Sequence, residues 1–184
     1  MTRWFFYFLF YSFAGYCLEK LFARVTHAPK QVRKCFLFLP LCPVYGLAMT
    51  AVLAAVPPDA SFPHLFLSCA VICTAVEYLV HLFYDRIFRV QFWDYTPLSG
   101  NIGGRVCPQF SAAWGLLAAI AVRWIQPAAA AVRLPRIMVY GVWLLLAADC
   151  VCTAFLLMRR QDTELLTPAA VLAQMRAESQ SSTS

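Results

Sequence analysis

The sequence predicts an all-α protein that forms a polytopic membrane helix bundle. Of its residues 61% are hydrophobic and 13% are charged, whereas about 25% of the residues of an ordinary soluble domain are charged. Five apolar stretches also approach the roughly 20 residues that a helix needs to cross the hydrocarbon core of a bilayer. We therefore expect about five transmembrane helices in a single domain of residues 1–160, followed by a largely disordered cytoplasmic tail of residues 161–184. The expected spans are 4–22, 36–56, 62–84, 110–125 and 137–158.

The first span, residues 4–22, is interpreted as a retained signal anchor. Its positive charges, Lys20 and Arg24, follow the apolar core, and the stretch has no A-x-A-like cleavage site.

Prolines mark the limits of the second span, and a polar helix face marks the third. Pro40 and Pro43 stand near the beginning of the second span, where a missing amide costs little because first-turn donors have no intrahelical partner. Pro57 and Pro58 end it. In the third span, residues spaced by four share one helix face: Cys69, Cys73, Glu77, His81 and Asp85.

Between the third and fourth spans lies the unusually polar stretch "FWDYTPLSGNIGGRVCPQF", residues 92–110. Its glycines and prolines prevent a continuous helix, and irregular backbone at membrane depth survives only where protein or water satisfies it. We expect a re-entrant or interfacial cytoplasmic segment that brings Asp94, Asn101 and Arg105 close to Glu19 and Glu77. A plain interfacial loop is the alternative.

The fourth span opens with a pattern that also opens the second. "CPVYGLA" begins at Cys42 and "CPQFSAAWGLLA" begins at Cys107, and each follows a basic loop and a span with a glutamate near its inner end. This pattern indicates a 2+2 internal repeat whose copies run parallel, related by an axis along the membrane normal. Chance similarity between two apolar segments is the alternative. The fifth span follows the repeat and carries its own acid, Asp149.

The distribution of Lys and Arg predicts the orientation of the chain, because cytoplasmic loops retain positive charge. One side of the membrane collects ten such residues: Arg24, Lys30, Arg33, Lys34, Arg86, Arg89, Arg105, Arg159, Arg160 and Arg176. The other side collects four: Arg3, Arg123, Arg133 and Arg136. We therefore expect a multi-pass protein of the bacterial inner (plasma) membrane, with its N-terminus outside and its C-terminus in the cytoplasm. The net charge of +6 then reflects topology and contact with the lipid bilayer, and it does not indicate nucleic-acid binding.

Acids within the spans are the main functional candidates, because an ionisable residue in hydrocarbon is costly unless it faces protein or water. Glu19, Glu77 and Asp149 all fall in the cytoplasmic half of their spans, which predicts one polar chamber open to the cytoplasm. The candidate binding residues of this chamber are Glu19, Glu77, His81, Asp94, Asn101, Arg105 and Asp149. The alternative is that each acid is structural and bonds a neighbouring helix or pairs with Lys20 or Arg105.

The sequence gives little indication of a metal site or a cofactor site. Glu77, His81 and a cysteine one turn away could share a divalent ion, but a hydrogen-bonded histidine near the interface is the simpler interpretation. We therefore expect no metal, no cofactor and no catalytic residue. The chain lacks a G-x-x-x-x-G-K-[ST] phosphate loop, so any coupling to ATP requires a separate ATPase subunit.

Residues of the polar stretch and of the spans around it also resemble a known family. "FWDYTPLSGNIGGRVCPQFSAAWG", together with "VEYLVHLFYD", "YSFAGYCLEKLF" and "LPLCPVYG", resembles the putative ABC-transporter type IV family of small multi-pass bacterial membrane proteins. The resemblance covers roughly residues 5–125. Phe92, where a second Trp is common, and the insert Leu98–Gly100 depart from the family pattern. The resemblance implies a permease, and it carries over no defined substrate or catalytic residue.

Three functions are compatible with these observations. A permease-like transport component would bind a cation, a proton or a small polar solute in the chamber, and five short spans would then require a homo-oligomer or partner membrane subunits. A non-catalytic scaffold or accessory subunit would use the same polar residues for helix packing. An intramembrane enzyme acting on a lipid headgroup would use Glu77 or His81 as general base and Arg105 to hold phosphate. The sequence favours transport.

Overall fold

The computed structural model describes residues 2–26, 35–133, 135–163 and 166 of the 184-residue chain. These residues form helices and contain no strand: α1 (Thr2–Val25), α2 (Pro43–Ala55), α3 (Phe62–Phe83), α4 (Pro108–Ile120), α5 (Gln126–Ala131) and α6 (Arg136–Arg160), with π-helical turns η1 (Tyr84–Phe88) and η2 (Ala121–Ile125). The all-α prediction is therefore confirmed for this part of the chain. Lys30, Arg33, Lys34, Arg176 and most of the expected tail lie outside the described residues.

Three continuous helical stretches are long and apolar enough to cross a membrane. They are Phe62–Phe88, Pro108–Ala131 and Ile137–Arg160, which correspond to the third, fourth and fifth expected spans. α1 has 24 residues and is long enough, but it is less apolar. α2 has 13 residues, or about 20 Å at 1.5 Å per residue, which is shorter than a hydrocarbon core of about 30 Å.

The second helix begins later than the sequence predicts. The expected span starts at residue 36, whereas α2 starts at Pro43 and the preceding residues form bends. Two prolines explain the difference, because Pro40 and Pro43 each disfavour helical backbone in the residue before them. The amides of Phe38 and Leu39 instead donate to the side chain of Asp149 on α6.

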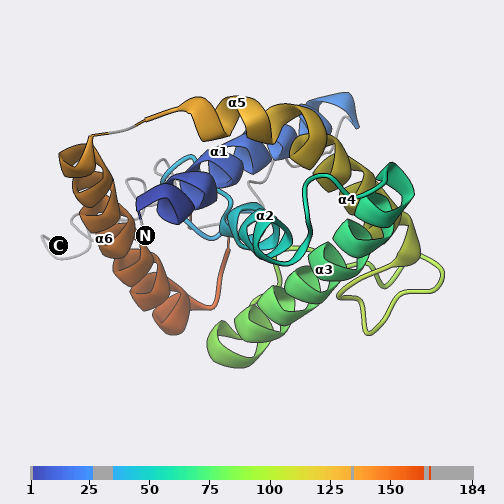
Figure 1. Ribbon diagram of the computed structural model, residues 1–184. Coiled ribbons are helices and arrows are strands. Elements are labelled where there is room, and N and C mark those ends of the chain that lie inside the picture. The colour runs from blue at the N-terminus through green and yellow to red at the C-terminus, as the bar shows by residue number, and fades with distance from the viewer. Residues whose placement is uncertain (1, 27–34, 134, 164–165, 167–184) are drawn as a thin grey trace, which may run out of the picture.

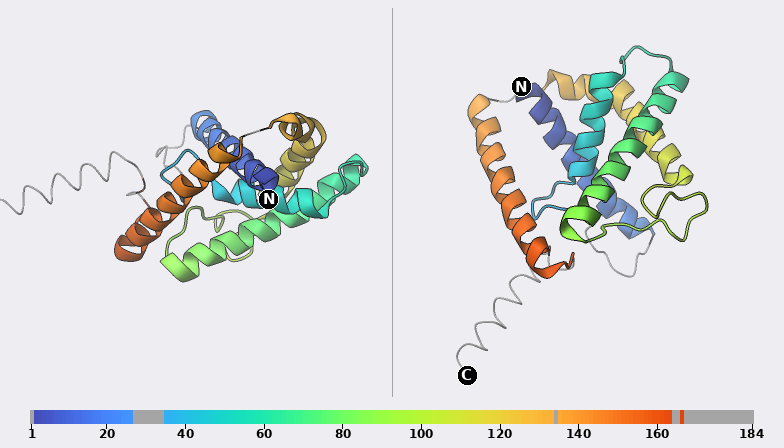
Figure 2. Two further views of the ribbon diagram at one scale, coloured as in Figure 1. Left: turned by 60° about the vertical axis from the view of Figure 1, so that its left-hand side comes forward. Right: turned by 90° about the horizontal axis from the view of Figure 1, so that it is seen from below.

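The first four helices form the compact part of the bundle (Figure 1). α1 packs most closely against α2, α3 packs most closely against α4, and α2 also lies against α3. A hydrogen bond from the Tyr11 hydroxyl to Gln126 (2.8 Å) ties α1 to α5. In Figure 2, right, the α2–α3 connection lies at one end of the bundle and the segment 89–107 at the other. We call the latter the loop-bearing end.

α6 stands apart from the compact part (Figures 1 and 2). Only 11% of the residues in its apolar window are buried, against 33% in each of the other two apolar spans. Its contacts include a tilted ring pair between Phe5 and Trp143 and a buried cluster in which Leu157 packs with Tyr84 and Phe88. Most of α6 therefore presents apolar side chains to its surroundings, as a helix in lipid does.

Candidate functional site

The segment between η1 and α4 folds into a hydrogen-bonded loop at the loop-bearing end. The Tyr95 amide donates to the Gly104 carbonyl (2.8 Å), and the Ile102 amide donates to the Val106 carbonyl (2.9 Å). Gly104 has a φ of +70°, which favours glycine, and a Cβ there would come within 2.7 Å of side-chain oxygens of Asp94 and Thr96. The loop is therefore defined by its own backbone bonds and glycines.

Asp94 and Asn101 hold this loop together. One carboxylate oxygen of Asp94 accepts hydrogen bonds from the Thr96 amide (2.8 Å) and the Thr96 hydroxyl (2.5 Å). Asn101 donates to the Leu98 and Thr96 carbonyls (2.7 and 3.2 Å) and accepts from the Gly104 amide (2.9 Å). Both side chains thus bond to the loop itself, and their closeness to Glu19 and Glu77 stays a prediction.

Glu77 on α3 is the most deeply enclosed acid of the candidate set, with 6% of its surface exposed. Its Oε1 accepts hydrogen bonds from the Tyr95 hydroxyl of the loop (2.9 Å) and from the Trp114 indole of α4 (3.2 Å). Its Oε2 is also buried and has no hydrogen-bond partner. Burial, and then the Glu77 carboxylate, raise the pKa of Tyr95, so the tyrosine remains a protonated donor.

Glu19 on α1 makes a comparable contact with the next helix. The Tyr45 hydroxyl of α2 donates to Glu19 Oε1 at 2.7 Å. Tyr45 reaches this position because Gly15 leaves space for it: a Cβ on Gly15 would collide with the tyrosine ring. The Tyr45 ring in turn packs edge-on against the Trp114 ring, with centroids 5.5 Å apart. Tyr45 and Trp114 therefore lie between the two glutamates.

The two helix pairs use the same register around these acids. In each pair an aromatic residue donates to the glutamate of the preceding helix, and the next residue is a glycine that packs on that helix. Gly46 faces Ser12, and Gly115 faces Ala70. Ser12 and Ala70 each lie seven residues before the glutamate of their own helix.

His81 and Trp93 connect α3 to the loop. His81 is 3% exposed, and its Nε2 lies 3.1 Å from the Trp93 carbonyl, to which it can donate. The Trp93 indole donates to the Arg105 carbonyl (3.0 Å). His81 Nδ1 is buried without a partner. The loop is thereby fixed against α3 one turn beyond Glu77.

Arg105 is paired with Asp85 of η1. Its guanidinium lies 2.9 Å from the Asp85 carboxylate, and the two side chains are 23% and 30% exposed. It also lies over the Tyr78 ring, 5.8 Å from the centroid. The sequence led us to expect Arg105 opposite Glu19 and Glu77, whereas this ion pair joins the loop to the end of α3.

Asp149 makes a separate contact on α6. Its two carboxylate oxygens accept the amides of Phe38 (3.0 Å) and Leu39 (2.7 Å), and one of them also accepts the Thr153 hydroxyl (3.2 Å). These bonds hold α6 to the segment before α2. These three donors differ from the aromatic donors of Glu19 and Glu77, so Asp149 forms a site of its own.

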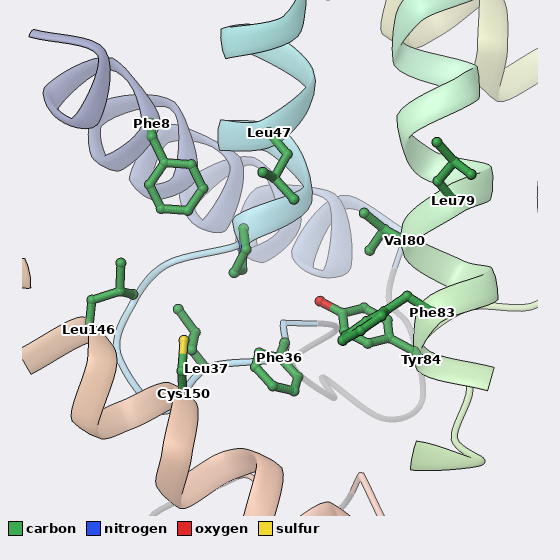
Figure 3. A pocket seen from close by; sticks show the side chains of 11 residues that line it. Phe8, Phe36, Leu37, Leu47, Leu79, Val80, Phe83, Tyr84, Leu146 and Cys150 are labelled. Carbon is green, nitrogen blue, oxygen red and sulfur yellow. The ribbon is translucent and has the colours of Figure 1, made fainter. Parts of the chain in front are cut away.

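A cavity of about 320 Å³ lies between α6 and the compact part of the bundle (Figure 3). Apolar side chains from four helices line it: Phe8, Leu47, Leu79, Phe83, Leu146 and Cys150. Neither Glu19 nor Glu77 lines it. This cavity is therefore distinct from the expected polar chamber.

The polar contacts also involve Tyr45, Tyr95, Trp114 and Asp85, for which the sequence indicated no such role. The aromatic-Gly motif that opens the second and fourth spans contains Tyr45 and Trp114, so the repeated motif could have identified these two residues from the sequence. Within the described residues, no group of three or more His, Cys, Asp or Glu side chains is arranged to hold a metal ion.

Residues 6–155 match the family described as "Putative ABC-transporter type IV". Because the match covers most of the chain, the chain belongs to this family, as the motifs indicated. No curated protein and no solved structure matches it. The family and the apolar helices identify a membrane protein, and they agree with a role in membrane transport.

Proposed function

We propose that this family member is a permease-like transport component in which Glu77 binds a proton, a cation or a small polar solute. The observation that carries the proposal is the state of the Glu77 carboxylate. One oxygen receives two donors, while the other is buried without a partner. An ionised carboxylate with a bare buried oxygen is costly, and a proton or a bound ligand at this oxygen would remove that cost.

Glu19 is proposed as the second carboxylate of the pathway. It approaches Glu77 through the Tyr45 and Trp114 rings, which are in contact. Asp94, Asn101, His81 and Arg105 are assigned to shaping the loop beside this pair, and Asp149 to holding α6. Protonation of Glu77 would be a natural switch of the site, because it would change which of the neighbouring donors can form a hydrogen bond to the carboxyl group.

We also infer that the compact part consists of two copies of one helical hairpin, α1–α2 and α3–α4. The equal seven-residue spacing to each glutamate, and the equivalent aromatic-Gly contacts, support this repeat. The short α2 makes a solute pathway through one copy of the chain incomplete, so we expect a homo-oligomer or partner membrane subunits. A separate ATPase subunit would supply any ATP coupling.

The test is flux through proteoliposomes that contain the full-length chain. Proton movement is driven by a potassium diffusion potential and followed with a pH-sensitive dye trapped inside the vesicles. We expect Glu77→Gln to reduce the flux to the level of protein-free vesicles, because the amide cannot bind and release a proton. Asp59→Asn is the matched control, since Asp59 is an exposed acid at the opposite end of the bundle.

Flux that is the same in Glu77→Gln and in the parent protein would contradict the assignment of Glu77. In that case the second candidate, a non-catalytic scaffold or accessory subunit, would be favoured. The specific observation behind it is that Asp94, Asn101 and Asp149 form hydrogen bonds with backbone groups and threonine hydroxyls of the chain itself. A scaffold predicts that neutral replacements of Glu19 and Glu77 change assembly alone.

A further inference from the structure

The cavity beside α6 is a crevice between two apolar spans. Leu79 and Phe83 of α3 form one wall, and Leu146 and Cys150 of α6 form the opposite wall. In Figure 3 these side chains point toward a shared space from helices that are far apart in sequence. Because α3 and α6 are both long and apolar enough to cross a membrane, we expect the crevice to lie at the depth of the hydrocarbon core.

The chemistry of the crevice fits a hydrocarbon chain. Its lining offers almost no hydrogen-bonding group, since only the Tyr84 hydroxyl and the Cys150 thiol are polar. Water is not retained in such a space. If the crevice were empty, the side chains along its walls would lose dispersion contacts. A helix from a second copy is a poorer fit, because a helix at least 10 Å across would fill about 320 Å³ with less than one turn.

The charges at the loop-bearing end fit an anionic headgroup. η1 and α6 both reach this end, where Arg86, Arg89 and Arg159 are exposed. Of the described acids there, Asp85 is already paired with Arg105, Asp94 accepts hydrogen bonds from Thr96, and Asp162 is exposed. Basic residues between transmembrane helices are a common binding site for the headgroups of anionic lipids.

We propose that the crevice between α3 and α6 binds one acyl chain of an anionic phospholipid, whose headgroup contacts the arginines at the ends of η1 and α6. The lipid would fill the gap that leaves α6 so loosely packed. This inference is independent of the transport proposal, because it uses neither Glu19 nor Glu77.

The test is native mass spectrometry of the full-length chain in detergent, titrated with phosphatidylglycerol or with phosphatidylcholine of the same acyl chains. We expect the parent protein to bind phosphatidylglycerol several-fold more tightly. Leu79→Trp and Leu146→Trp fill the crevice from opposite walls and should weaken binding of both lipids several-fold. Leu144→Trp is the control, because Leu144 is 71% exposed and does not line the crevice.

The headgroup contact is tested separately with Arg86→Gln combined with Arg159→Gln. This variant should lose the preference for phosphatidylglycerol and keep the binding of phosphatidylcholine, while Arg133→Gln at the opposite end should keep both. Leu79 is 61% exposed, so its replacement is expected to leave the fold intact even if Leu146→Trp does not.

Two results would overturn the proposal. One is equal binding of the two lipids by the parent protein, with no effect of either tryptophan. The other is a parent protein that is dimeric in detergent and becomes monomeric in Leu79→Trp, which would assign the crevice to a second copy.

Discussion

At the scale of single residues, the polar side chains fall into two groups. Glu77 and Glu19 accept hydrogen bonds from aromatic donors across a helix interface, whereas Asp94 and Asn101 accept and donate within one loop. A sequence alone distinguishes these groups poorly, because both consist of acids and amides beside apolar runs. What separates them is which backbone donors are close in space.

Asp94 gives a prediction about pH. The Thr96 hydroxyl, and then the Thr96 amide, hold the pKa of Asp94 below its ordinary value of 3.8. A carboxylate with a lowered pKa stabilises its loop above the ordinary value, and the effect is lost as the pH falls through the lowered value. We expect the Thr96 amide to remain protected from hydrogen exchange at pH 3.8 and to lose protection below it.

The measurement is amide exchange at Thr96, corrected for the intrinsic rate at each pH. Asp94→Ala should abolish the protection at every pH, and Asp59→Ala should leave it unchanged. Protection that is equal in Asp94→Ala and the parent protein would mean that the carboxylate does not hold this turn.

At the scale of elements, small residues set the distance between paired helices. Gly115 on α4 packs on Ala70 of α3 so closely that a Cβ would lie 2.6 Å from the alanine Cβ and 2.9 Å from its Cα. Gly141 on α6 has no neighbour within 4 Å of such a Cβ. Replacing glycine by alanine is therefore expected to change stability in opposite directions at these two positions.

We expect Gly115→Ala to destabilise the protein by about 1–3 kcal/mol through overpacking. Gly141→Ala should stabilise it by up to about 1 kcal/mol, because alanine favours helix more than glycine does. Denaturant unfolding in detergent measures both changes. If Gly115→Ala were as stable as Gly141→Ala, the close contact of α3 with α4 would be disproved.

The limits of the helices show how far periodicity and proline placement predict this fold. The third, fourth and fifth expected spans each correspond to a helix, because long apolar runs in lipid leave the backbone little choice but to bond internally. The second expected span is seven residues too long at its beginning, because hydropathy registers the apolar residues 36–42 and ignores Pro40 among them and Pro43 directly after them. The π-helical turns η1 and η2 had no counterpart in the sequence pattern.

The candidate site was predictable in part for a related reason. An acid inside an apolar run identifies a buried carboxyl group, and Glu77 is indeed buried. The donor of each hydrogen bond depends on tertiary packing, so spacing within one helix did not reveal Tyr45, Tyr95 or Trp114. Charge alone also placed Arg105 beside the glutamates, although Asp85 on the neighbouring turn is its partner.

At the scale of the whole molecule, the positive charges and the connections divide between two ends. Arg24, Arg86, Arg89, Arg105 and Arg159 belong to segments at the loop-bearing end, and the α2–α3 connection lies at the other.

We expect the loop-bearing end to face the cytoplasm. An epitope inserted between Pro58 and Asp59 should bind antibody in intact spheroplasts, and one appended after Ser184 should bind only after lysis. The reverse pattern would invert the proposed orientation.

The contact between Tyr45 and Trp114 places an indole at the meeting point of the two hairpins. An indole emits light whose wavelength and intensity depend on nearby charge, and Trp114 donates directly to Glu77 while touching the residue bound to Glu19. A chain in which the other four tryptophans are replaced by phenylalanine would thus carry a built-in optical probe of both carboxylates, with no external dye attached.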